Sequence, residues 1–180
     1  PKTVHRSPSR RHTNTPPKQS TALLPDDYKQ SCFRVLLKDP ALGHQTWEQL
    51  VQIMKNDKTQ QSHKLAIYGA LGHVHSKQYK LKTLDLTWEI KLQDFFYPFS
   101  GVALSGKEGG DLLYNWMKEN WSQIKARVSR GAGSLLQAVV GNCCGGSTEE
   151  RAADVEAFFK DKDEPSLRRT LKQVCERTRV

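Results

Sequence analysis

The sequence predicts an all-α protein of antiparallel helical hairpins stacked as a superhelix, and three observations support this. From Leu23 onward, apolar residues recur at a spacing near 3.6, the period of one helix face. The loops between these apolar runs are short, so neighbouring helices should be antiparallel. No segment has the pattern of a convincing β-strand. We therefore expect about nine helices.

The predicted helices pair at a loose interval of roughly 30–40 residues, without a strict sequence repeat. This interval is typical of HEAT- and armadillo-like solenoids, in which each helix pair buries its apolar face against the next. A chain of 180 residues is long enough for such a core. We expect one α-helical repeat domain at residues 23–180.

Capping residues, prolines and glycines set the expected helix boundaries in the first half of the chain. The first helix should carry an apolar stripe of Tyr28, Cys32, Val35 and Leu36. The expected helices run from Asp26 to before Pro40, from a Thr46 cap through Met54, from Thr59 to Gly72, and from a Ser76 cap to Leu86.

Five further helices are expected in the second half. The run Ser147-Thr148-Glu149-Glu150-Arg151 is a strong helix start, because a hydroxyl cap precedes carboxylates that suit the positive end of the helix dipole. Proline is also favourable in a first turn. The expected helices are about Gln93–Leu104, about Glu108–Val128, Gly131–Gly141, one that starts in the run 147–151 and one from Pro165.

The segment Leu92–Trp121 is the centre of the predicted repeat array and contains a near match to a phosphate-binding loop, Gly101-Val-Ala-Leu-Ser-Gly106-Lys107. A phosphate loop continues with Ser or Thr, whose hydroxyl holds magnesium, whereas this chain continues with Glu108. That carboxylate would stand where phosphates bind, at a helix N-terminus. We expect these glycines to form a turn between two helices.

The aromatic residues have positions that predict packing. Trp116, Trp121, Phe158 and Phe159 occupy expected core positions. Stacking on RNA bases is the weaker interpretation. We expect these aromatic side chains to pack one hairpin against the next.

No self-contained active site is evident. His73 and His75 have strand spacing, and the sequence shows no partners for a metal role. Four cysteines, Cys32, Cys143, Cys144 and Cys175, lack paired zinc-ligand spacing and are expected to be thiols in a reducing cytosol. Neither H-E-x-x-H nor G-x-S-x-G occurs. We assign no catalytic, metal-binding or cofactor-binding residue and expect no enzymatic activity from the chain as it stands.

The net charge of +9 is concentrated at one end. Residues 1–22 are rich in Pro, Ser, Thr and Arg, and we expect them to be disordered or extended. This tail could be a basic arm that binds RNA or an acidic protein surface, or it could be a solvated leader. We favour the solvated leader. The candidate arm residues are Lys2, Arg6, Arg10, Arg11 and Lys18.

The apolar runs are too short for the roughly 20 residues of a membrane span. The N-terminus also lacks the apolar stretch of a signal peptide. We expect a cytoplasmic protein without membrane contact. The chain begins with Pro1 rather than Met, which is compatible with a fragment or a processed product.

The order of several short motifs over about residues 23–178 is similar to that of one known domain. It resembles the C-terminal helical domain of zinc-dependent gluzincin aminopeptidases, nearest the puromycin-sensitive type. The resemblance rests on Gln93-Asp94, Gly101-Val102-Ala103, the W-x-K-E-N-W block from Trp116 to Trp121, Thr148-Glu149-Glu150, the run from Val155 to Phe159, and Arg169 to Gln173.

This resemblance implies a HEAT/armadillo-like superhelix that closes over a catalytic domain, forms one wall of the peptide chamber and limits substrate access. In some members it also senses the distal end of the peptide. The zinc site, H-E-x-x-H with a downstream Glu, and the G-x-M-E-N loop belong to the parent enzyme and are not in this chain. The implied partner is that catalytic domain; zinc and peptide substrate are expected only in the parent.

Two features depart from the family pattern. Pro98 falls in a segment that the family keeps helical and should kink or interrupt it. Residues 1–22 are expected to have no counterpart in the family. Both leave an alternative open: a stand-alone helical-repeat scaffold subunit of a larger assembly, such as a ribonucleoprotein, that uses the basic arm.

Overall fold

The computed structural model describes residues 26–128, 134–162 and 164–178, and these residues form α-helices and short 3₁₀ helices without a strand. The predicted all-α class is confirmed. The elements are α1 (Asp26–Lys38), α2 (Gly43–Lys55), α3 (Gln61–Leu71), α4 (Lys77–Asp85), η1 (Leu86–Glu89), η2 (Leu92–Asp94), α5 (Tyr97–Ala103), α6 (Lys107–Val128), α7 (Ser134–Cys143), α8 (Glu149–Lys160), η3 (Pro165–Leu167) and α9 (Arg168–Thr178).

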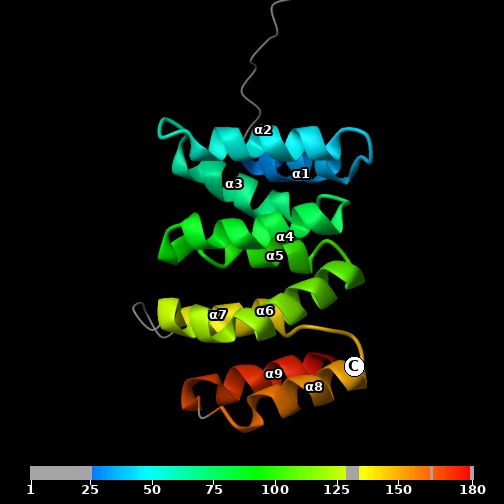
Figure 1. Cartoon of the computed structure of the whole chain (residues 1–180), viewed down its shortest axis with the longest axis vertical. Coiled ribbons are helices and arrows are strands. Elements are labelled where there is room, and N and C mark those ends of the chain that lie inside the picture. Colours follow the sequence, from blue (N-terminus) through cyan, green and yellow to red (C-terminus); the bar gives the residue numbers. More distant parts are fainter. Residues whose placement is uncertain (1–25, 129–133, 163, 179–180) are drawn as a thin grey trace, which may run out of the picture.

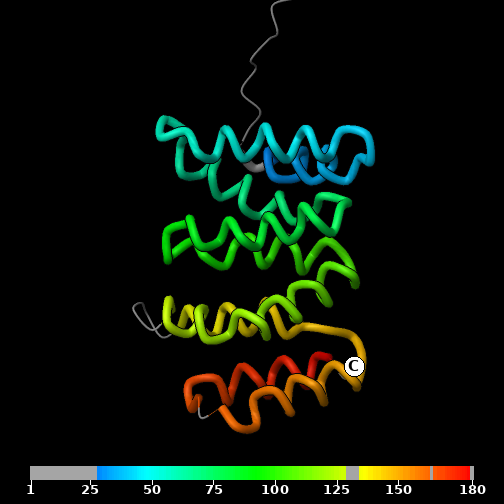
Figure 2. Tube along the Cα trace, in the orientation of Figure 1, coloured from blue at the N-terminus to red at the C-terminus, as the bar shows by residue number. Residues whose placement is uncertain are grey.

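The helices are stacked in two layers, as Figure 1 and the Cα trace in Figure 2 show. In one layer α1, α3, α5, α7 and α9 pack successively on one another. The other layer contains α2, α4, α6 and α8, which lie over the first. Successive α-helices alternate between the two layers, so the chain runs through the stack as a series of hairpins. The predicted superhelix is therefore confirmed.

The apolar core has two parts, which share the α4–α5 region as their border. The N-terminal part, from α1 to η1 and the segment after it, includes Leu37, Trp47 and Ile67. The C-terminal part extends from α4 to α9 and includes Phe99 and Val155. The stack is thus stabilised by two clusters of buried side chains that must be held against each other.

Aromatic side chains join successive hairpins within the C-terminal part. Phe99 of α5 contacts Phe95 edge-on, with ring centroids 5.1 Å apart, and Trp116 of α6 at 5.6 Å. Further along α6, Trp121 contacts Phe159 of α8 at 5.0 Å, also edge-on. Such edge-to-face contacts stabilise beyond the burial of area alone. The predicted aromatic packing between hairpins is confirmed.

A contact between glycines holds α3 against α5. A Cβ added to Gly101 would lie 2.9 Å from the carbonyl oxygen of Gly69, and one added to Gly72 would collide with the backbone of Gly101 and Val102. These helices therefore approach more closely than any side chain would allow. Because α3 belongs to the N-terminal core and α5 to the C-terminal core, this contact fastens the two parts together.

The predicted start of the second helix is wrong. Thr46 caps no helix, because α2 already begins at Gly43. The side chain of Asp39 accepts hydrogen bonds from the backbone N–H groups of Ala41 (2.8 Å) and Leu42 (3.1 Å), and this turn starts the helix earlier.

Pro98 does not kink a helix. It lies in the first turn of α5, which begins at Tyr97 and follows the short helix η2. A proline is favourable there because first-turn N–H groups have no partner within the helix. The segment from Gln93 to Leu104 is therefore a 3₁₀ helix followed by a short α-helix rather than one continuous helix.

The stripe predicted on the first helix is present but faces solvent. Val35 and Tyr28 are 70% and 62% exposed, and Cys32 is also exposed. The neighbouring Leu37 is fully buried instead. The predicted helical spacing is therefore confirmed, and this stripe lies outside the core.

We expect Gly101→Ala to destabilise the protein by about 1–3 kcal/mol, because the added methyl group forces α3 and α5 apart. Gly110→Ala in α6 is the matched control, since no atom lies within 4 Å of its added Cβ. That change should stabilise by up to about 1 kcal/mol through helix propensity. Urea unfolding of both variants measures the difference, and equal effects would contradict the close glycine contact.

Candidate functional groove

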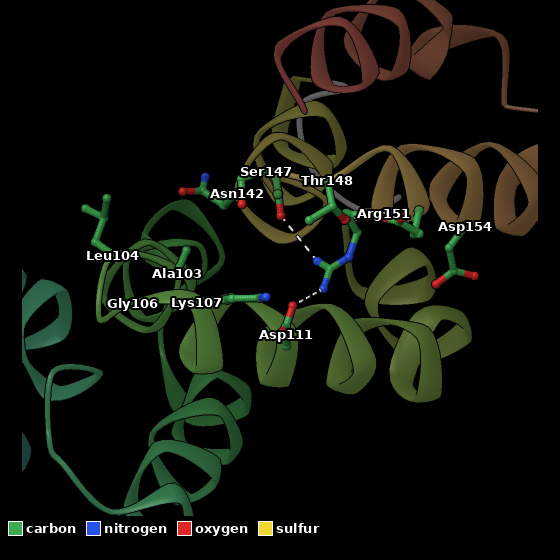
Figure 3. A pocket seen from close by; sticks show the side chains of 14 residues that line it. Ala103, Leu104, Gly106, Lys107, Asp111, Asn142, Ser147, Thr148, Arg151 and Asp154 are labelled. Atoms are coloured by element: carbon green, nitrogen blue, oxygen red, sulfur yellow. Dashed lines mark hydrogen bonds and ion pairs between the residues drawn. The ribbon is translucent and has the colours of Figure 1, made fainter. Parts of the chain in front are cut away.

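An open groove of about 770 Å³ lies where the second layer passes from α6 to α8 (Figure 3). The turn between α5 and α6 and the first turns of α6 form one side. The loop between α7 and α8 and the first turns of α8 form the other. The groove is therefore bounded by chain segments about 40 residues apart, as the ion pair between Asp111 and Arg151 shows.

The glycine motif of the sequence forms one wall of this groove. Gly106 has a φ of 125°, in the left-handed region that favours glycine, and α6 begins at the next residue, Lys107. The predicted turn between two helices is confirmed. Lys107 extends across the groove in the direction of Asp111, while Leu104 at the rim is 64% exposed (Figure 3).

Arg151 is the central side chain of the opposite wall. Its backbone N–H donates to the hydroxyl of Thr148 at 3.2 Å, which confirms the predicted cap of α8. Its guanidinium pairs with the carboxylate of Asp111 on α6 and donates to the carbonyl oxygen of Gly145 at 3.3 Å (Figure 3). It also stacks over Tyr114, 4.3 Å from the ring centroid. Arg151 thus binds α8 to α6.

A second cation covers the same tyrosine. Lys118 Nζ lies 4.4 Å from the centroid of the Tyr114 ring and donates to Asp154 of α8 at 2.9 Å. This hydrogen bond lowers the pKa of the Asp154 carboxyl. Burial raises the pKa of the Tyr114 hydroxyl well above its usual range, so this tyrosine is neutral at physiological pH. These groups form a bridge between α6 and α8 in which each cation has a carboxylate partner.

The arrangement suits binding more than catalysis. It offers the flexible cation of Lys107, the carboxylates of Asp111 and Glu150, the small residues Gly145 and Gly146, and the apolar Leu104. A chain with a peptide backbone and mixed side chains could find polar and apolar contacts there. Among the described residues, no group of three or more His, Cys, Asp or Glu side chains could hold a metal ion.

The glycine turn and the hydroxyl-capped start of α8 were predicted from the sequence, whereas the bridge was not. Asp111, Tyr114, Lys118, Arg151 and Asp154 show no local pattern, because the partners lie on different helices. Only knowledge of which helices are neighbours could have paired them.

His73, His75 and the four cysteines do not belong to the groove lining. His73 is buried and His75 is exposed. Burial raises the pKa of the Cys143 thiol well above its usual value and raises that of the Cys144 thiol to about 12. Both thiols are therefore protonated at neutral pH. The candidate arm residues Lys2, Arg6, Arg10, Arg11 and Lys18 precede the described residues, so the arm and the boundary at residue 22 stay predictions.

Comparison with known proteins identifies the stack. The model of the ERAP1-like C-terminal domain matches residues 6–180. The chain belongs to this family. The resemblance to the C-terminal helical domain of gluzincin aminopeptidases is therefore confirmed. The match also covers most of residues 1–22, so our expectation that this segment has no counterpart in the family is wrong.

Three full-length relatives show the extent of the similarity. Aminopeptidase M1-B of Oryza sativa subsp. japonica is 30% identical over 180 residues, which cover 99% of this chain and 20% of the relative. Aminopeptidase M1 of Arabidopsis thaliana is 27% identical over 166 residues, which cover 90% of this chain and 18% of the relative. The alanine/arginine aminopeptidase of Saccharomyces cerevisiae is 26% identical over 139 residues, covering 76% and 16%. The chain thus spans a fifth or less of the length of these relatives.

None of the helices in residues 26–128, 134–162 and 164–178 combines the length and apolar character that a membrane crossing requires.

We expect Arg151→Met to lower the free energy of unfolding by about 1–3 kcal/mol, because it removes the ion pair and leaves Tyr114 without one of its stacked cations. Lys172→Met is the control, since its pair with Glu176 is exposed on both sides and 3.9 Å long. That change should cost less than about 0.5 kcal/mol. Chemical unfolding of the two variants measures the difference; equal costs would show that the α6–α8 bridge contributes nothing.

Acidification should destabilise the domain through His73. Burial, and then the positive charges of Arg34 and Lys38, lower the pKa of His73 from 6.5 to about 4. The unfolded chain therefore binds a proton between these pH values that the folded chain does not. The free energy of unfolding should fall by up to about 1 kcal/mol per pH unit as the pH drops through this window.

Thermal unfolding measured from pH 7 to pH 4 tests this expectation. His73→Asn should reduce the slope of stability against pH, whereas His75→Gln, at an exposed position, serves as the matched control. An unchanged slope in His73→Asn would show that other groups cause the acid sensitivity.

Proposed function

We propose that this chain acts as the C-terminal helical domain of a zinc aminopeptidase, closes over the catalytic part of that enzyme and limits peptide access to its chamber. The family match over residues 6–180 is the observation that carries the proposal. The chain would contribute a wall rather than the chemistry, since the zinc ligands of such an enzyme would come from the catalytic part.

The groove supports a peptide-facing role for this wall. A peptide that is too long for the catalytic centre must contact the surrounding wall, and such a contact needs both polar and apolar groups. Leu104, in the turn after α5, and Lys107, the first residue of α6, provide them on the two sides of Gly106. We place the contact with the distal part of the peptide at this groove.

A scaffold subunit in a larger assembly is the second candidate. The charge of residues 1–22 favours it, because five basic residues without an acidic one could contact RNA or an acidic protein surface. Both candidates are compatible with a cytoplasmic location, which we also propose. The free thiols of Cys143 and Cys144 are in keeping with a reducing compartment.

A chimera tests the chamber role. The segment of rice aminopeptidase M1-B that matches this chain is replaced by the chain, and turnover of an aminoacyl-amide is compared with that of short and long peptides. We expect the chimera to retain aminoacyl-amide turnover. Its preference for short over long peptides should be about tenfold greater than that of the enzyme that lacks the segment, which corresponds to roughly 1.4 kcal/mol.

A substitution in the groove tests whether the preference for short peptides arises there. Lys107→Glu should change the kcat/KM of the chimera for long peptides and leave the aminoacyl-amide unaffected, because only a long peptide reaches the groove. A chimera with no more length preference than the truncated enzyme would refute the chamber role and leave the scaffold candidate.

A further inference from the structure

A second, smaller pocket lies at the edge of the stack opposite to the groove. The groove opens where α6 and α8 begin, whereas this pocket, of about 200 Å³, lies where α2 ends and α3 begins (the left edge in Figure 1). The last turn of α2, the first two turns of α3 and residues 89–91 form its walls. This edge pocket shares no lining residue with the groove.

The edge pocket has a basic lining. Lys55, Lys64 and Lys91 contribute three positive charges and Glu89 one negative charge, so the net charge of the lining is +2. Lys55 and Glu89 form an exposed ion pair, with Nζ and Oε2 3.0 Å apart. No ion pair joins Lys64 or Lys91 to the residues that the structure describes. Within this part of the chain, two cations of the pocket thus lack an anionic partner.

Tyr68 adds a neutral donor to the edge pocket. It is 8% exposed, and burial, followed by the negative charge of Asp94, raises the pKa of its hydroxyl above the usual value. The hydroxyl therefore keeps its proton at neutral pH. Asp94 is buried and accepts a hydrogen bond from Gln61 Nε2 at 2.7 Å. No hydrogen bond joins the Tyr68 hydroxyl to another described residue, so its proton is available to a ligand.

Lys64 occupies a position that an isolated helix disfavours. It is the fourth residue of α3, so its cation lies near the positive end of the helix dipole. The first turn of α3 has no acidic residue, and the side chain of Gln60 makes no capping hydrogen bond. Lys55, in contrast, lies in the last turn of α2, where a cation is favourable. An anion in the edge pocket would offset the unfavourable charge of Lys64.

The donors of the edge pocket match a phosphate group better than a carboxylate. A phosphate monoester has a charge between about −1.5 and −2 at neutral pH and three terminal oxygens that accept hydrogen bonds. Ammonium groups bind phosphate as point charges, whereas planar carboxylates pair best with the guanidinium of arginine. Met54 and Ile90 offer apolar contacts for the carbon atoms of an ester. The volume of the pocket restricts the ligand to a small one.

We propose that the edge pocket binds the phosphate group of a small phosphate monoester. Lys64 and Lys91 pair with the phosphate oxygens, the Tyr68 hydroxyl donates a hydrogen bond, and Lys55 adds a third cation while it stays paired with Glu89. The convergence of three lysines and a buried tyrosine on one pocket carries the inference. It does not depend on the groove or on the chamber role.

A phosphate in the edge pocket would also connect parts of the N-terminal core. It would join α2 and α3 to the segment 89–91, which α6 already holds, because Arg127 donates to the carbonyl oxygen of Ile90 at 2.5 Å. Ligand binding should therefore stabilise the folded chain by mass action.

Phosphorus NMR tests the proposal directly. The resonance of glycerol phosphate is recorded at constant ionic strength while the full chain is added, and we expect it to broaden. Lys64→Gln and Lys91→Gln should each weaken binding by about tenfold, because each removes a charge-assisted contact. Lys58→Gln is the matched control, since Lys58 is exposed on the same edge but does not line the pocket. It should weaken binding by less than about twofold.

A gain of affinity provides the second measurement, because a folding defect cannot imitate it. Glu89→Gln removes the acidic residue of the lining and frees Lys55, so binding should tighten by about threefold. Tyr68→Phe keeps the ring in place and removes the hydroxyl. This change should weaken binding by about fivefold.

The choice of ligand separates the sources of the phosphate group. Equal broadening of inorganic phosphate and glycerol phosphate would show that the phosphate group alone is recognised, whereas stronger binding of the ester would show that its carbon atoms contribute. Either result upholds the site. Three results would overturn it: no broadening of either resonance, equal losses in Lys58→Gln and Lys64→Gln, or displacement of glycerol phosphate by an equal concentration of acetate.

Discussion

The structure depends on one close contact between backbones, where α3 and α5 meet at Gly69, Gly72 and Gly101. The core is divided between an N-terminal and a C-terminal cluster, and these two helices belong to different clusters. With side chains at the crossing, the helices would move apart and the border between the clusters would lose its packing. Glycine is destabilising within a helix. Here that cost is offset by the contact, which joins the N-terminal and C-terminal core clusters into one stack.

This contact also explains why the central segment resembles a phosphate-binding loop. Gly101 is required by helix packing and Gly106 by a left-handed turn, so two unrelated backbone constraints produce the spacing of the motif. Lys107 follows as the first residue of α6. Glu108 was sufficient to argue against a nucleotide site from the sequence. The role of Gly101 could not be predicted, because its partners are on a helix about 30 residues earlier in the chain.

The same distinction separates what the sequence predicted from what it did not. Helical periods, the cap at Thr148 and the burial of Trp116 and Trp121 depend on neighbouring residues, and these were predicted. Asp39 starts α2 early through two local hydrogen bonds that compete with the expected cap at Thr46. Pro98 was predicted to kink or interrupt a helix, but the effect of a proline depends on where the helix begins, and Pro98 lies in the first turn of α5. The α6–α8 bridge could not be predicted, because it joins helices whose proximity is a property of the fold.

The exposed stripe of α1 has a physical meaning that periodicity alone cannot give. An amphipathic pattern shows that a helix has an apolar side, but the number of neighbours decides how many sides are covered. Helices inside a repeat stack have a neighbour on each side, and terminal helices have one. α9 exposes mostly charged side chains, whereas α1 has apolar residues on both faces. The first and last helices of the described stack therefore differ in the chemistry of their exposed faces, a difference that a helical period cannot predict.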